Sequence, residues 1–175
     1  MARGKRISIV DQGGHNVIPT LRFATEANVA VGAIQKGMLL KWKSNGSPFV
    51  IPCVDGDHTI GTDTAIVGLA ASDGTQTAAA DGTIDVYMPL PGVVYEAYAT
   101  TAANANTDAE IAALVGDRVG IDVSATTEAG DWTLDENEGE AQTFAFLIVG
   151  GDALRSTIKF IIRTGATMLG DQDLA

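Results

Sequence analysis

Turn-forming residues recur at short intervals along most of this chain, and they leave room only for short secondary-structure elements. Clusters of Gly, Pro, Asn, Asp and Ser separate stretches of about four to eight residues rich in β-branched and aromatic side chains, a spacing typical of all-β folds. The clusters lie at residues 44–48, 55–57, 72–74, 81–82, 89–92, 129–131 and 150–152. We therefore expect a mainly β domain, folded as a β-sandwich or a β-tulip-like barrel.

The stretches between these turns define the strands. They cover residues 38–43, 49–54, 64–71, 83–89, 93–100, 118–124, 132–134, 142–149 and 156–164. Asn45 and Gly46 favour positive φ, which predicts a hairpin between the first two strands. Pro52 cannot donate to a sheet ladder, so its strand is expected at an edge or at a bulge.

One segment is expected to be helical. Thr107 and Glu110 have the spacing of a capping box, in which a hydroxyl and a carboxylate each accept a backbone amide at the start of a helix. Apolar residues follow at helical spacing, and Gly116 occupies the place of a left-handed C-terminal cap. The pattern predicts one short inserted helix over residues 107–115.

The first 28 residues lack a sustained period of either kind and are punctuated by Gly13 and Pro19. We expect residues 1–28 to form an extended N-terminal arm, residues 29–165 the β domain, and residues 166–175 a loosely ordered C-terminal tail. A length of 175 residues suits one such domain, which is long enough to bury a core. The arm is expected to be mobile in the free protein and to become ordered only on a partner.

Charge is divided unevenly along the chain. Residues 1–43 hold seven of the eleven Lys and Arg against two acidic residues, whereas residues 44–154 hold eighteen acidic residues and one basic residue, Arg118. Because charge distribution bears on partners more than on fold, this division predicts a binding or assembly protein whose basic arm contacts an acidic surface. The acidic body repels nucleic acid, so no nucleic-acid partner is expected.

No recognisable catalytic pattern is present in the sequence. Cys53 is the only cysteine, and its apolar strand predicts a buried, inert thiol. Cys53 and His58 are close enough in sequence to meet across a bend, which leaves a thiol-based enzyme as a third hypothesis. The chain has no nucleophile elbow, phosphate-binding loop or His-Glu-x-x-His motif. We expect no enzyme activity and no cofactor.

Two acidic turns contain some of the residue types that bind metal ions. Counting from Asp135, an EF-hand loop requires Gly at its sixth position and Glu at its twelfth, where this chain has Glu140 and Phe146. Residues 55–58, Asp-Gly-Asp-His, offer ligands, but aspartates are also what such a turn favours. We expect no metal at either turn. The alternative function left open is an acidic soluble β-sandwich module that binds calcium or carbohydrate.

Membrane and export signals are not expected. The longest apolar run, residues 144–149, is far too short to span a bilayer. The N-terminus lacks the longer apolar stretch and the cleavage site of a secretory signal, and the single cysteine fits a reducing interior. We therefore expect a protein of a reducing interior, with no membrane partner.

Two short segments carry a resemblance to a known family. Residues 68–75, Gly-Leu-Ala-Ala-Ser-Asp-Gly-Thr, and residues 83–92, Thr-Ile-Asp-Val-Tyr-Met-Pro-Leu-Pro-Gly, resemble the capsid decoration proteins, or cement proteins, of tailed bacteriophages. The resemblance implies a virion structural protein on the capsid exterior, which reinforces contacts between major capsid subunits. It also implies a β-sandwich or β-tulip body with an extended arm, often as a homotrimer.

The arm is the expected capsid-contacting site. Its apolar side chains are expected to pack on the shell, and its cations to steer it towards acidic patches. The residues expected to make these contacts are Arg3, Lys5, Arg6, Ile7, Ile9, Val17, Ile18, Leu21, Arg22 and Phe23. Deletion of the arm is then expected to leave the body folded and to weaken attachment.

Overall fold

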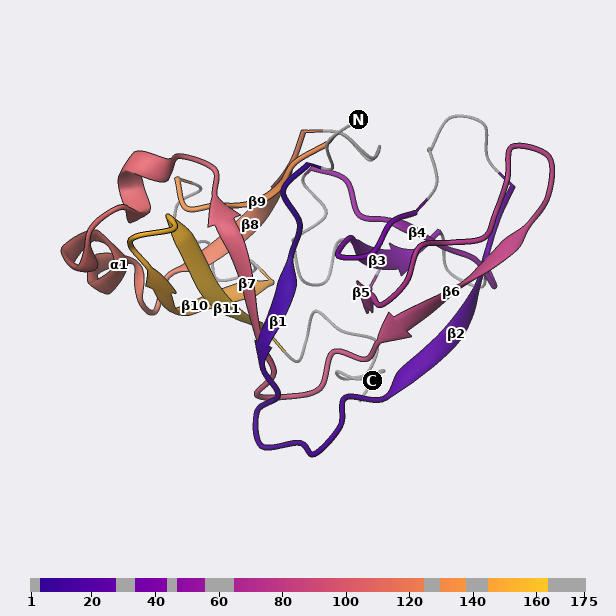
Figure 1. Cartoon of the computed structure of the whole chain (residues 1–175), viewed down its shortest axis with the longest axis horizontal. Helices are drawn as coiled ribbons and strands as arrows, with labels where there is room; N and C mark the ends of the chain where they lie inside the picture. The colour runs from indigo at the N-terminus through magenta and orange to yellow at the C-terminus, as the bar shows by residue number, and fades with distance from the viewer. Residues whose placement is uncertain are drawn as a thin grey trace, which may run out of the picture.

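Two β-sheets form the body of the protein, and one short α-helix packs beside the larger sheet (Figure 1). The computed structural model describes residues 4–27, 34–43, 47–55, 65–124, 130–137 and 145–163. Within these residues, strand residues far outnumber helical residues. The mainly β, two-sheet class that was expected from the turn spacing is confirmed.

The larger sheet contains six strands in the order β1-β7-β11-β10-β8-β9. They are β1 (Ser8–Asp11), β7 (Val94–Ala99), β8 (Arg118–Val123), β9 (Trp132–Asp135), β10 (Phe146–Asp152) and β11 (Thr157–Ile162). Neighbours in this order are antiparallel. In addition β9 pairs in parallel with β7, through Tyr98 with Thr133 and Ala99 with Leu134. The sheet therefore closes on itself at the seam between β7 and β9.

The smaller sheet contains five antiparallel strands in the order β2-β6-β5-β3-β4. They are β2 (Thr20–Thr25), β3 (Leu39–Trp42), β4 (Val50–Pro52), β5 (Ile66–Ala70) and β6 (Gly82–Tyr87). The pairing of β3 with β4 confirms the expected hairpin, although its turn residues Asn45 and Gly46 lie outside the described residues. Pro52 ends the edge strand β4, as expected for a residue that cannot donate to the ladder.

Strand alternation places one face of the larger sheet in the core. On β11 the side chains of Ile158, Phe160 and Ile162 are buried, whereas the intervening Lys159 and Ile161 are half-buried. Successive side chains of a strand point to opposite faces, so this period of two identifies the inward face. The buried side chains of both sheets belong to one continuous hydrophobic cluster, so the two sheets share a core.

Three aromatic rings meet inside the larger sheet. Phe160 stacks on Tyr95 with ring centroids 5.7 Å apart and meets Phe146 edge-on at 5.3 Å. All three side chains are fully buried. Because β7, β10 and β11 each contribute one ring, this cluster holds three neighbouring strands together.

The predicted helix is confirmed as α1 (Asp108–Leu114). The Thr107 hydroxyl accepts the Glu110 amide at 3.3 Å, and the Glu110 carboxylate accepts the Thr107 amide at 3.0 Å, which completes the capping box. Gly116, two residues beyond the helix, has the left-handed φ of +100°. A 3₁₀ turn, η1 (Ala102–Ala105), precedes the helix and was not predicted.

Replacement of Thr107 by alanine is expected to lower the free energy of unfolding by about 1 kcal/mol. The change removes the acceptor for the Glu110 amide and leaves an unsatisfied donor in the first turn of α1. Urea unfolding followed by circular dichroism measures the loss. Thr107→Ser is the matched control because it keeps the hydroxyl, and an equal loss in both variants would contradict a capping role.

The structure corrects the prediction of a separate N-terminal arm. β1 pairs with β7 in the larger sheet, and β2 pairs along its whole length with β6 in the smaller sheet. Ile7 and Ile18 are buried in the shared core. Both strands are edge strands with one exposed side and little apolar alternation, so their sequences do not have the period that identifies a half-buried strand.

The turn expected at residues 150–152 is displaced in the structure. β10 continues to Asp152, and the turn occupies residues 153–156. A register shift between Ile148 and Gly150 carries the chain through the glycines as part of the strand. The Asp152 carboxylate then accepts the Leu154 amide at 3.0 Å, which stabilises the displaced turn.

Candidate binding groove

The N-terminal segment lies between the two sheets and forms one wall of a cavity of about 510 Å³. We call this cavity the N-terminal groove. Figure 1 shows β1 beside β7, on the side of the larger sheet that faces the smaller one. The residues that line the groove are Ile7, Ser8, Ile9, Gln12, Val17, Ile18, Lys36, Gly37, Leu69, Ala70 and Tyr87.

A bridge of backbone hydrogen bonds closes one end of the groove. The Ile7 amide donates to the Gly37 carbonyl at 3.2 Å, and the Gly37 amide donates to the Ala70 carbonyl at 3.0 Å. Gly37 has a φ of +86°, and a Cβ at this position would lie 2.9 Å from both the Ile7 oxygen and the Arg6 Cβ. Only glycine fits where β1, β5 and this turn meet.

Lys5 and Arg6 are held at the seam of the larger sheet. The Lys5 amide donates to the Asp131 carboxylate at 2.6 Å, and the Trp132 amide donates to the Lys5 carbonyl at 3.1 Å. The Arg6 guanidinium donates to the carbonyls of Lys5 and Gly130. The Lys5 ammonium lies 5.2 Å from the centroid of the Tyr98 ring. These contacts join the start of the described chain to β7 and β9.

Arg22 is paired within the smaller sheet. Its Nε donates to Asp85 Oδ1 at 2.8 Å across the β2–β6 ladder, and its Nη2 donates to Asp85 Oδ2 at 3.2 Å. The hydrogen bond from Arg22 lowers the pKa of Asp85, and the same hydrogen bond raises the pKa of Arg22. Both side chains are exposed, so the pair adds little to stability.

The predicted contact residues therefore divide into several groups. Ile7, Ile9, Val17 and Ile18 line the N-terminal groove, and of these only Val17 is largely exposed, at 74%. The remaining described residues of the prediction lie elsewhere: Lys5 and Arg6 at the seam, and Leu21, Arg22 and Phe23 on β2. Arg3 lies outside the described residues.

The second wall of the groove was missed by sequence reasoning. Leu69, Ala70 and Tyr87 are contributed by β5 and β6, more than fifty positions after β1 in the chain. Their local pattern identifies strands but gives no sign that they face the N-terminal segment. The pairing of β2 with β6 and the hydrogen bonds through Gly37 to Ala70 bring them there.

Charge in the groove is confined to one lysine. Lys36 is the only charged residue among the lining residues, and it makes no ion pair within the described part of the chain. Its backbone amide donates to the Asp73 carboxylate at 2.9 Å. An exposed ammonium thus stands beside aliphatic walls.

Many carboxylates of the protein accept hydrogen bonds from backbone amides in turns and connecting segments. The Glu136 carboxylate accepts the amides of Thr100 and Thr101 at 3.0 and 2.9 Å, and it also accepts the Asn104 side chain at 3.2 Å. Other carboxylates accept backbone amides in the same way: Asp11, Asp73, Asp81, Glu110, Asp131, Asp135 and Asp152. Part of the negative charge of residues 44–154 therefore belongs to carboxylates that stabilise the fold by accepting backbone amides.

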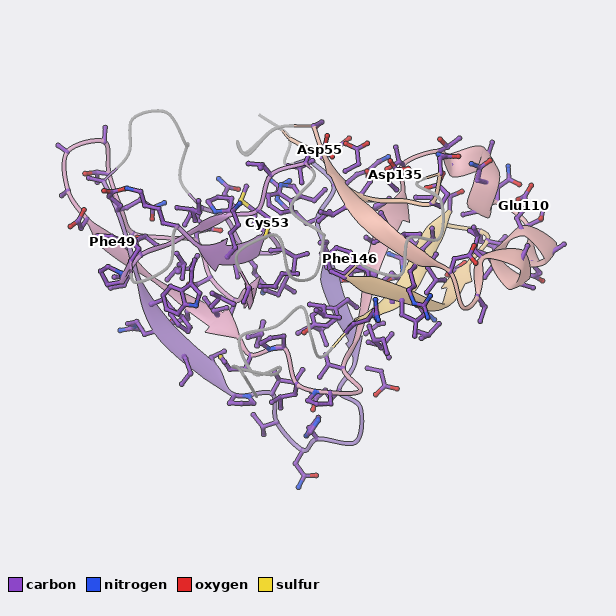
Figure 2. All side chains as sticks on the ribbon, turned by 180° about the vertical axis from the view of Figure 1, so that it is seen from behind. Phe49, Cys53, Asp55, Glu110, Asp135 and Phe146 are labelled. Atoms are coloured by element: carbon purple, nitrogen blue, oxygen red, sulfur yellow. The ribbon has the colours of Figure 1, made fainter. Side chains whose placement is uncertain are left out.

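Among the described residues no three His, Cys, Asp or Glu side chains are grouped so that they could hold a metal ion. Asp135 is described, whereas Glu140 of the same turn, and Asp57 and His58 of the other, lie outside the described residues. Asp135 is engaged with the Asn137 amide at 3.0 Å. Figure 2 places Glu110 at one end of the molecule and Cys53 nearer its middle.

Cys53 is buried with 1% of its surface exposed, as the apolar sequence around it predicted. Its amide donates to the Leu39 carbonyl at 2.9 Å, which extends the pairing beyond β4. His15, the described histidine, has Nε2 3.1 Å from the Pro91 carbonyl oxygen. Thiol chemistry requires an accessible, activated thiolate, and burial opposes both conditions.

No protein-family model matches this chain, and a comparison with curated proteins gives no match either. In the described part of the chain, no helix has the length and apolar character needed to cross a membrane.

Proposed function

We propose that this protein is a virion structural protein that binds the outer surface of a bacteriophage capsid and reinforces contacts between major capsid subunits. The two segments that resemble decoration proteins each contribute residues to the second wall of the N-terminal groove. Residues 68–75 include Leu69 and Ala70, and residues 83–92 include Tyr87. The observation that carries the proposal is this coincidence of the resembling segments with an open, largely apolar groove.

The mechanism is non-catalytic binding by several copies at once. Each groove supplies a modest contact, and a homotrimer that engages several shell subunits gains a high effective concentration for each further contact. Any ligand that binds the assembled shell, and not the dissociated subunits, stabilises the shell by mass action. The acidic surface of the body keeps it apart from the packaged nucleic acid, which suits a place on the capsid exterior.

The test uses empty shells assembled from the major capsid protein that is encoded in the same genome. We expect the protein to sediment with expanded shells, to saturate at a fixed ratio to capsid subunits, and to raise the temperature at which the shells disassemble. Bovine serum albumin, an acidic protein of unrelated fold, is the control for trapping in the pellet. Absence of saturable sedimentation would overturn the proposed function.

A further inference from the structure

The free edge of β1 and the apolar walls beside it point to a particular kind of ligand. We infer that the N-terminal groove binds an extended segment of the capsid subunit, which adds as a strand to β1. The segment carries aliphatic side chains and a carboxylate that pairs with Lys36. The identity of the partner rests on the proposed function, whereas the extended form and the chemistry of the segment rest on the groove.

Backbone geometry supports strand addition. β1 is an edge strand, with β7 on one side only. The Ile7 amide points away from β7, because it donates to Gly37 on the side of the smaller sheet. Backbone groups alternate between the two edges along a strand, so Ile9, two residues further on, directs its amide and carbonyl to this same side. Ile9 is also one of the residues that line the groove, which places this edge of β1 beside it.

Side chains of the groove favour aliphatic partners. Val17 is 74% exposed at its rim, and Val10 and Leu21, which flank this stretch of chain, are 44% and 49% exposed. An extended ligand places alternate side chains into such a surface while its backbone pairs with β1. The volume of about 510 Å³ is within the range of ligand pockets, and the aliphatic residues of the lining suit aliphatic side chains of an extended segment.

The positive charge of Lys36 favours a ligand segment that carries a carboxylate. The Lys36 ammonium makes no ion pair within the described residues, although the Lys36 backbone amide donates to Asp73, and no acidic residue lines the groove. A carboxylate on the ligand would therefore meet an unpaired ammonium at the rim.

Two substitutions in the N-terminal groove, one at an apolar residue and one at Lys36, test the inference through their effect on sedimentation with the same shells. Val17→Asp is expected to weaken binding at least about tenfold, because it places a carboxylate against the aliphatic side chains of a ligand that is itself acidic. Lys36→Glu is expected to weaken it about two- to fivefold at low salt, with the difference fading at high salt. Leu154→Asp is the matched control, since Leu154 is fully exposed on the β10–β11 turn, away from the groove, and its variant should bind as the wild type does.

Crosslinking identifies the occupant directly. With p-benzoylphenylalanine in place of Val17, irradiation of the shell complex is expected to yield an adduct to an aliphatic and acidic segment of the capsid subunit. An adduct to another copy of this chain, or to a basic segment, would overturn the inference. Wild-type binding by both groove variants would also overturn it while leaving the proposed function in place, because wild-type sedimentation tests that function separately.

Discussion

A chain that lacks residues 1–27 is expected to lose the cooperative unfolding transition of the full protein. The deletion removes β1 and β2, and with them Ile7 and Ile18 from the core. It also removes the Lys5 carbonyl that accepts the Trp132 amide at the seam between β7 and β9. Each buried isoleucine is worth about 1.5–3 kcal/mol, and a whole domain is stable by only about 5–15 kcal/mol. The loss of two paired strands therefore removes much of that stability.

Urea unfolding of the full and truncated chains, followed by circular dichroism and Trp fluorescence, measures this effect. A separately made peptide of residues 4–27, added to the truncated chain, is expected to restore part of the transition because it supplies both strands. A truncated chain that unfolds as cooperatively as the full protein would contradict the structure. It would favour the arm that the sequence suggested.

Replacement of Phe160 by alanine is expected to lower the free energy of unfolding by about 3–5 kcal/mol. Phe160 is fully buried and contacts both Tyr95 and Phe146, so the change leaves a cavity and removes two ring contacts. Aromatic pairs contribute about 0.5–1.5 kcal/mol beyond the area that they bury. Urea denaturation gives the loss from the shift of the midpoint.

Leu154→Ala is the matched control for this core substitution. Leu154 is fully exposed, so its truncation is expected to change the free energy of unfolding by less than about 0.5 kcal/mol. If the Phe160 variant were as stable as the Leu154 variant, the aromatic cluster would not be part of the stabilising core.

Sequence reasoning succeeded where a local pattern determines the structure. Thr107 and Glu110 form the predicted capping box because all of its groups lie within one turn of chain. β11 was predicted because its stretch of chain is rich in β-branched and aromatic side chains and follows a cluster of turn residues. The same reasoning failed at β1 and β2, whose pairing with β7 and β6 supplies the stability that their own sequences do not indicate.

The candidate groove was predictable in part. Ile7, Ile9, Val17 and Ile18 were expected to contact a partner because they are apolar residues in a segment without a clear period. The opposite wall depends on which strands pair across long distances, which no local pattern specifies. The basic residues of the arm were also assigned to a partner, yet Arg22 pairs with Asp85 inside the protein. The charge composition of a segment gives the number of its cations, but it does not show whether they pair within the protein or with a partner.

The early position of β1 in the chain has a consequence for the time course of folding. Its ladder partner β7 begins at Val94, and the hydrogen bond from Lys5 to Asp131 spans 126 positions. At a synthesis rate of about 5–20 residues per second, the interval between the synthesis of β1 and that of β7 is on the order of ten seconds. Contacts of such separation slow folding, because a long loop must close before they form. Ile7 and Ile9 stay exposed during this interval, so the nascent chain depends on the completion of its later strands to bury the first one.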